Sequence, residues 1–193
     1  MKHILFICTG NTCRSPLAEG MLRQLARERG LAIEVRSAGV AAYEGAPASD
    51  HTATILREKG IKEPHKASPL TGDLLDWADL VLTMTQSHKR HAIQLFPEAV
   101  DKIFTLKEYT LDDPAELEAV AEIERLYADA QMKQALAQPI TDDERSRMTE
   151  LQRKLPSYDI ADPFGGSLTT YRKSAEEIER SLHKLIRKLE SFS

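Results

Sequence analysis

Short apolar runs alternate along this chain with stretches in which apolar residues recur every three to four positions. The first run, His3–Cys8, ends abruptly in turn residues, as expected of a strand that is buried on both faces. Such runs predict strands at His3–Cys8, Ala32–Gly39, Leu80–Met84 and Lys102–Leu106. The periodic stretches predict helices at Ser15–Gly30, Ser49–Lys59, Thr71–Ala78, Ser87–Phe96 and Leu168–Glu190. This order predicts an α/β fold: a three-layer sandwich in which helices flank a four-stranded parallel sheet, with a site at the carboxyl ends of the strands.

The first predicted helix carries recognisable signals at both ends. Ser15 is expected to cap it, Pro16 suits its first turn, and Gly30 can close it. The residues of its apolar face are Leu17, Met21 and Leu25.

The region between Thr110 and Tyr158 departs from the alternation of strands and helices. Two helical patterns are split there by Pro139, and the second opens with a capping box from Thr141 to Glu144. We therefore predict an inserted αα-hairpin with a common apolar seam, formed by Leu117, Val120, Ile123, Tyr127 and Ala130 on one helix and by Met148, Leu151 and Leu155 on the other. The hairpin is either a surface excursion that packs on itself or a cover that restricts large substrates. No linker marks a boundary, so residues 1–193 are expected to form a single domain with this insertion at about 110–158.

Composition and charge narrow the class of protein. The 193 residues are 41% hydrophobic and 29% charged, which is ordinary for a globular chain. A net charge of -4 argues against a nucleic-acid partner. No apolar run approaches the roughly 18 to 20 residues that span a bilayer, so no membrane partner is expected. The first residues turn polar too early for a secretory signal, and the expected location is therefore the cytoplasm.

Both cysteines of the chain lie in one short loop, Cys8–Arg14, between the first predicted strand and the first predicted helix. Backbone N–H groups and the helix dipole at such a junction favour a bound anion. The same surroundings, together with the charge of Arg14, favour a thiolate on Cys8. Because the planar guanidinium of Arg14 matches two phosphate oxygens, the loop is expected to hold a phosphate group under attack by Cys8.

Other residues of this loop suit the same purpose. Gly10 allows close approach of the backbone, Asn11 tolerates left-handed geometry, and the Ser15 hydroxyl can donate to the thiolate. Two alternatives stay open: Cys8 as a small core residue, and a zinc site on Cys8 and Cys13. The zinc site has a poor ligand set, because no further pair of His or Cys residues lies nearby.

Phosphoryl transfer also requires a proton donor for the leaving group. The stretch "DIADPFGGS" offers Asp159 and Asp162. Asp162 is the better candidate, since Pro163 stiffens its turn and two glycines follow that let a loop fold over a pocket. The alternative is a plain turn aspartate.

Three motifs in the order "CTGNTCRS", "SAGV" and "DPFGGS" resemble the low-molecular-weight protein tyrosine phosphatase family, and within it the bacterial protein arginine phosphatases. The resemblance covers Met1 to about Tyr109 and about Asp159 to the carboxyl end. It implies Cys8 as nucleophile, Arg14 as phosphate ligand, and Asp162 as general acid and then base. It also implies phosphorylated protein substrates and neither a metal nor another cofactor. The substrate-binding positions that it implies are Thr9, Gly10, Asn11, Thr12, Cys13, Ser15 and Phe164.

The choice of phosphoarginine as substrate rests on two positions. Tyrosine-specific members typically carry an aliphatic residue in place of Thr12 and a tyrosine in place of Phe164, whereas arginine phosphatases resemble this chain at both. Alternative functions are a protein tyrosine phosphatase, a thiol-dependent arsenate reductase and an anion-binding regulatory module. A reductase needs further cysteines, and the chain has none beyond Cys13. The resemblance also makes the inserted hairpin unusual, because compact family members lack it.

Cys13 has two interpretations. It can trap an oxidised Cys8 in a reversible disulfide, which would make the site redox-sensitive, or it can simply fill space inside the loop.

Overall fold

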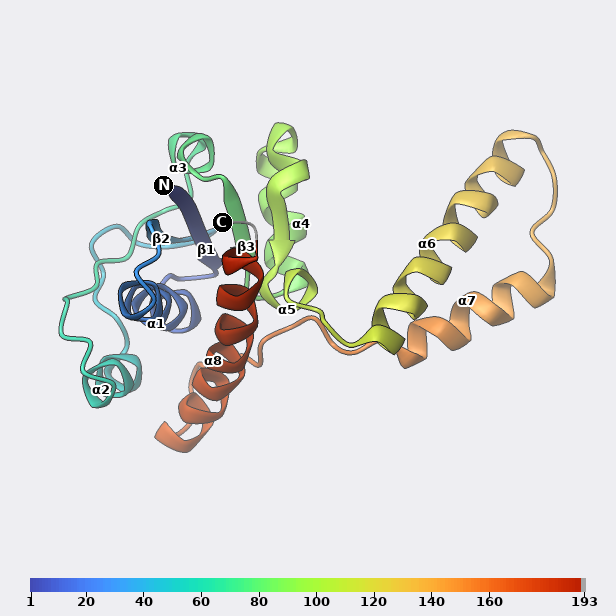
Figure 1. Cartoon of the computed structure of the whole chain (residues 1–193). Coiled ribbons are helices and arrows are strands. Elements are labelled where there is room, and N and C mark those ends of the chain that lie inside the picture. Colours follow the sequence, from blue (N-terminus) through green and yellow to red (C-terminus); the bar gives the residue numbers. More distant parts are fainter. Residues whose placement is uncertain (192–193) are drawn as a thin grey trace. The chain divides into compact units, whose positions relative to one another are not determined.

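Four strands form one parallel sheet in the computed structural model, which describes residues 1–191 (Figure 1). The strands are β1 (Lys2–Cys8), β2 (Ile33–Gly39), β3 (Leu80–Thr83) and β4 (Ile103–Thr105). Their order across the sheet is β2-β1-β3-β4, and every pairing is parallel. The predicted four-stranded parallel sheet is confirmed.

Helices cover both faces of this sheet. On one face the apolar side chains of α1, α2 and α8 pack on Ile4 and Phe6 of β1, and on the other face those of α3 and α4 pack on Leu5 and Ile7. All four of these β1 side chains are fully buried, which explains the continuous apolar run of the first strand. The helices are α1 (Arg14–Glu28), α2 (Asp50–Glu58), α3 (Gly72–Trp77), α4 (Gln86–Leu95) and α8 (Leu168–Glu190).

The beginning of α1 differs from the prediction. Its cap position is Cys13, whose side chain makes no capping bond, and Ser15 lies inside the helix. The Ser15 hydroxyl cannot cap the helix because it is bonded to the side chains of Cys8 and Asn11. The predicted end is confirmed, since Gly30 follows α1 with a φ of 63°, a left-handed value that glycine adopts without strain.

Two short elements near β4 were not predicted from the sequence. A 3₁₀ turn, η1 (Pro97–Lys102), precedes the strand, and a one-turn helix, α5 (Leu106–Tyr109), follows it. Leu106 was expected to end the strand, but it begins α5. The cause is a capping box in which Thr105 and Glu108 satisfy each other's backbone N–H groups.

The chain divides into two compact units, residues Met1–Thr110 with Tyr158–Ser193, and residues Leu111–Ser157. The second unit contains the predicted helical hairpin, formed by α6 (Pro114–Ala135) and α7 (Asp142–Lys154). The predicted capping box at the start of α7 is confirmed, with Thr141 and Glu144 bonded to each other's backbone N–H groups.

The predicted seam of the hairpin is only partly correct. Ile123 and Leu151 are buried, but Leu117 and Tyr127 remain 46% and 43% exposed. Ion pairs contribute to the contact instead, because Arg147 of α7 binds Glu122 of α6 at 2.7 Å. The two helices therefore meet through a small apolar contact that is flanked by charged side chains.

The strand order places two loops at one edge of the sheet. β1 lies between β2 and β3, so the connections from β1 and from β3 leave the sheet at a point where the strand order reverses. Crevices that bind ligands in parallel sheets form at such points, at the carboxyl ends of the strands. The loop after Cys8 and the turn after Thr83 meet here.

Candidate active site

Cys8 is the last residue of β1 and the start of the phosphate loop, residues Cys8–Arg14. Its side chain is buried, and its sulfur lies 2.9 Å from the Ser15 hydroxyl oxygen. Ser15 is the second residue of α1, so the sulfur lies close to the positive end of that helix. The Cys8 sulfur therefore lies beside both a hydroxyl group and the positive end of a helix.

Asn11 organises the phosphate loop from within. Its φ is 54°, which confirms the left-handed geometry expected from the sequence, and its side chain is fully buried. The amide nitrogen donates to the hydroxyls of Ser15 and Ser37 at 2.8 Å each, while the amide oxygen accepts from the backbone N–H of Ser68 at 2.9 Å. These bonds hold the loop in a strained conformation that the backbone would not keep alone.

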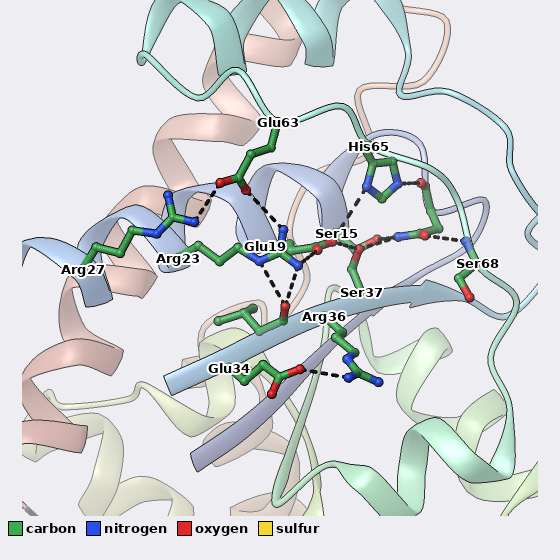
Figure 2. Close-up of polar contacts among 12 residues, drawn as sticks. Ser15, Glu19, Arg23, Arg27, Glu34, Arg36, Ser37, Glu63, His65 and Ser68 are labelled. Atoms are coloured by element: carbon green, nitrogen blue, oxygen red, sulfur yellow. Dashed lines mark hydrogen bonds and ion pairs between the residues drawn. The ribbon is translucent and has the colours of Figure 1, made fainter. Parts of the chain in front are cut away.

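The Ser37 hydroxyl that Asn11 contacts belongs to a wider network of polar side chains, which includes Glu19, Arg23 and His65 (Figure 2). The Ser37 hydroxyl donates to the buried carboxylate of Glu19, which also accepts from Arg23 at 2.5 Å. His65 contacts both the phosphate loop and Glu19, because its Nε2 lies 2.7 Å from the Asn11 carbonyl oxygen and its Nδ1 lies 3.7 Å from the Glu19 carboxylate. Of Ser37, Glu19, Arg23 and His65, only Ser37 belongs to a motif identified from the sequence, "SAGV".

Gly39 at the end of β2 is required by close packing against the phosphate loop. A Cβ atom built on it would lie 2.4 Å from the Thr9 carbonyl oxygen and 2.9 Å from the Asn11 nitrogen. A Cβ atom on Gly10 would meet no protein atom closer than Thr12 Oγ1 at 3.6 Å. Close contacts within the protein therefore require glycine at position 39. The role expected for Gly10, close approach to a bound phosphate, stays a prediction.

Arg14 lies between the phosphate loop and the acid loop, residues Asp159–Gly166. Its guanidinium is almost fully buried, donates to the Ile160 carbonyl oxygen at 3.1 Å, and lies 3.4 Å from the Asp162 carboxylate. Within residues 1–191 its buried Nε atom has no hydrogen-bond partner. An unpaired buried donor is costly, and a bound phosphate oxygen would satisfy it.

The two candidate acids have different surroundings. Asp162 is 59% exposed and is held by the Phe164 backbone N–H at 3.2 Å, in addition to its contact with Arg14. The Asp159 carboxylate accepts instead from the backbone N–H of Gln86, the first residue of α4, at 2.8 Å. Asp162 is therefore the carboxylate that shares a site with Arg14.

His88 is a buried residue that the sequence analysis missed. Its Nε2 lies 2.8 Å from the Thr9 hydroxyl oxygen. Burial, followed by the charge of Arg14, lowers the pKa of His88 from 6.5 to about 4, although Asp162 and Asp159 oppose part of this shift. His88 is therefore neutral at pH 7.

The shifted pKa of His88 predicts an acid-sensitive fold. Between pH 6.5 and 4 the unfolded chain binds more protons than the folded one, so stability decreases as the pH falls through this interval. We expect His88 alone to account for a loss of about 2 kcal/mol, allowing for partial solvation. Urea unfolding at pH 7 and pH 4.5 should show a smaller loss for His88→Gln, which cannot titrate. An equal loss of stability in the wild-type protein and in His88→Gln would contradict the lowered pKa of His88.

Two of the remaining predicted positions, Thr12 and Phe164, differ in exposure. Thr12 is half-buried, and its carbonyl oxygen accepts from the Ser49 backbone N–H at 2.9 Å. Phe164 is 79% exposed on the acid loop. The loop that follows β2 contacts the phosphate loop, because the Ala41 backbone N–H donates to the Thr9 carbonyl oxygen at 2.9 Å.

The two cysteines are free and have different partners. The Cys13 sulfur lies 3.3 Å from the Tyr171 hydroxyl, whereas the Cys8 sulfur contacts Ser15. Across residues 1–191 no group of three His, Cys, Asp or Glu side chains is placed to hold a metal ion. Neither interpretation of Cys13, a partner for an oxidised Cys8 or a residue that fills space in the loop, is tested by this structure.

Comparison with known proteins identifies relatives along almost the whole chain. The model of the family "Low molecular weight phosphotyrosine protein phosphatase" matches residues 3–155. A protein-arginine-phosphatase of Geobacillus stearothermophilus is 38% identical over 191 residues, covering 98% of this chain and 97% of the relative. That of Bacillus subtilis (strain 168) is 36% identical over 186 residues, covering 96% and 95%. A solved YwlE arginine phosphatase mutant with a phosphorylated active-site serine aligns with a TM-score of 0.72 and 34% identity, covering 97% of this chain and 95% of that one. The chain belongs to the low molecular weight phosphotyrosine protein phosphatase family.

Proposed function

We propose that the protein is a cysteine-dependent protein phosphatase that hydrolyses phosphoarginine in proteins through a phosphocysteine intermediate. The observation that carries this proposal is one site that contains the buried Cys8 sulfur, the Asp162 carboxylate, and an Arg14 Nε donor with no partner among residues 1–191. The names of the two curated relatives support the choice of phosphoarginine. No helix within residues 1–191 combines the length and apolar character needed to cross a membrane.

The first step transfers the phosphoryl group to the enzyme. The amides of the phosphate loop and the Arg14 guanidinium hold the phosphate oxygens while the Cys8 thiolate attacks phosphorus. The bond from phosphorus to the leaving nitrogen or oxygen breaks, and Asp162 donates a proton to that atom. Because the thiolate is already stabilised by Ser15, the nucleophile needs no separate base.

The second step releases inorganic phosphate. The Asp162 carboxylate, deprotonated by the first step, takes a proton from a water molecule that attacks the phosphocysteine. The bond between sulfur and phosphorus breaks, and the Ser15 hydroxyl stabilises the departing thiolate of Cys8. One phosphorylated residue and one water are thereby converted into the free residue and phosphate, and the enzyme returns to its starting state.

Thr12 provides the physical argument for phosphoarginine over phosphotyrosine. Its side chain is half-buried beside Cys13, in the loop that holds the phosphate. A hydroxyl there can accept a hydrogen bond from a guanidinium N–H group, whereas an aliphatic side chain would pack better on a phenol ring.

We expect Thr12→Ile to raise the ratio of phosphotyrosine to phosphoarginine turnover by about tenfold or more, because the guanidinium donors lose an acceptor. The measurement compares kcat/KM on phosphoarginine and phosphotyrosine peptides of the same sequence. Thr12→Ser keeps the hydroxyl and is the matched control. An unchanged ratio in Thr12→Ile would show that another position determines the specificity, and Phe164 would be the next candidate. Wild-type enzyme that prefers the phosphotyrosine peptide would instead support a tyrosine phosphatase.

A further inference from the structure

The β3–α4 turn, defined here as residues Met84–His88, comprises the link after β3 and the first three residues of α4, and it contacts both loops of the active site. β3 pairs with β1, and the Met84 backbone N–H donates to the Ile7 carbonyl oxygen at 2.9 Å. The turn therefore leaves the sheet beside Cys8, on the side opposite β2. The catalytic steps proposed above use none of its residues.

One end of the turn holds the phosphate loop. His88 Nε2 lies 2.8 Å from the hydroxyl oxygen of Thr9, the residue directly after the nucleophile. His88 is only 6% exposed, and its position is fixed because its backbone N–H donates to the Thr85 hydroxyl at 3.1 Å. The imidazole thus holds the Thr9 side chain in place from the first turn of α4.

The other end of the turn holds the acid loop. The Ile160 backbone N–H donates to the Met84 carbonyl oxygen, and the Gln86 backbone N–H donates to the Asp159 carboxylate, each at 2.8 Å. These contacts lie two and three residues before Asp162. The turn itself is braced by the Thr83 hydroxyl, which donates to the Thr85 carbonyl oxygen at 3.0 Å.

Among residues 1–191, histidine at this buried position leaves a polar atom without a hydrogen bond, which is energetically unfavourable. In the part of the chain that the structure describes, its Nδ1 atom has no hydrogen-bond partner. The charge of Arg14 disfavours protonation of His88, as does that of His91, while Asp162 and Asp159 favour it. An apolar side chain of similar size would leave no buried polar atom unpaired, so the contact of Nε2 with Thr9 is the property that an imidazole provides here.

We propose that His88 and Asp159 are positioning residues that act through the turn Met84–His88 to fix the separation between the Cys8 thiolate and the Asp162 carboxyl group. The proposal rests on the phosphatase function proposed above. A displaced acid is most harmful when the leaving group is basic, because an acidic phenol departs without full protonation. Defects in the turn should therefore depend on the leaving group.

The test measures kcat/KM with phenyl phosphate, which has a basic leaving group, and with 4-nitrophenyl phosphate, which has an acidic one. We expect His88→Leu and Asp159→Ala each to lower kcat/KM about tenfold more on phenyl phosphate than on 4-nitrophenyl phosphate. His88→Gln can place an amide group near the position of Nε2, and Asp159→Asn keeps the oxygen that accepts from Gln86. Both conservative variants should return the ratio of the two substrates to within about threefold of wild type.

Equal losses on the two substrates, or no rescue by the conservative variants, would overturn the proposal and leave a structural role only. Competitive inhibition by inorganic phosphate reports whether the phosphate loop is intact in each variant. If His88→Leu fails to fold, the comparison of Asp159→Ala with Asp159→Asn decides the outcome alone, because the Asp159 side chain is exposed. If the Cys8→Ser variant still hydrolyses 4-nitrophenyl phosphate at the wild-type rate, the proposed function itself is refuted. This result is distinct from failure of the turn variants.

Discussion

Cys8→Ser is expected to lower kcat on a phosphoarginine peptide by at least about 10⁴-fold while leaving phosphate binding intact. The Ser15 hydroxyl, the positive end of α1 and the nearby Arg14 favour a thiolate, but they cannot deprotonate an alcohol to a comparable extent. Binding persists because the loop amides and Arg14 are unchanged. Steady-state hydrolysis measures the first effect, and calorimetric titration with inorganic phosphate measures the second.

Cys13→Ser makes the same change five residues further along the same loop. Its sulfur contacts the Tyr171 hydroxyl rather than Ser15, so we expect a loss of at most about tenfold. A second readout of Cys8→Ser is mass spectrometry after incubation with substrate, which detects a phosphoryl group retained on the variant. Undiminished hydrolysis by Cys8→Ser would rule out the phosphocysteine mechanism.

The fold was predictable because its signals are local. The apolar run of β1 reflects burial of Ile4, Leu5, Phe6 and Ile7 on two faces of one sheet, and this requires helices on both sides. The short helix α5 was missed because the apolar pattern at Lys102–Leu106 suits a strand, while the capping box between Thr105 and Glu108 decides the outcome. Local bonding thus overrode the hydrophobic pattern there.

The phosphate loop was predictable for the same reason, since Cys8, Arg14 and Ser15 lie within eight residues. The groups that support the loop come from distant segments, and no spacing in the sequence connects them. His65 lies 54 residues from Asn11, and His88 lies 79 residues from Thr9. A carboxylate at Glu19, four residues after Ser15 on a largely buried helix, is a signal in the sequence that could have indicated a polar face there.

The hairpin illustrates a different limit. Helical periodicity identified α6 and α7 correctly, but it could not tell which apolar side chains would be covered. Leu117 stays exposed, whereas the contact between the helices includes the pair of Arg147 with Glu122. Because charged side chains take part in the contact between these helices, the apolar pattern alone does not define that contact.

Asp162→Asn is expected to lower kcat/KM by roughly 10²- to 10⁴-fold, with the largest loss on substrates that have basic leaving groups. Asparagine keeps the size of the side chain and an oxygen that can accept from the Phe164 backbone N–H, but it supplies no proton to the leaving group. It also cannot take a proton from the attacking water, so hydrolysis of the phosphocysteine slows as well. Rates on a series of aryl phosphates with phenols of increasing basicity measure the effect.

The matched control is Asp159→Asn, the same substitution three residues earlier in the acid loop. Its amide oxygen can still accept from the Gln86 backbone N–H, so the anchor is preserved and a change of less than about threefold is expected. A larger loss in Asp159→Asn than in Asp162→Asn would assign the acid to Asp159. Equal losses for all leaving groups in Asp162→Asn would show that the carboxylate only orients Arg14, 3.4 Å away, because a group that transfers no proton has no reason to discriminate between phenols.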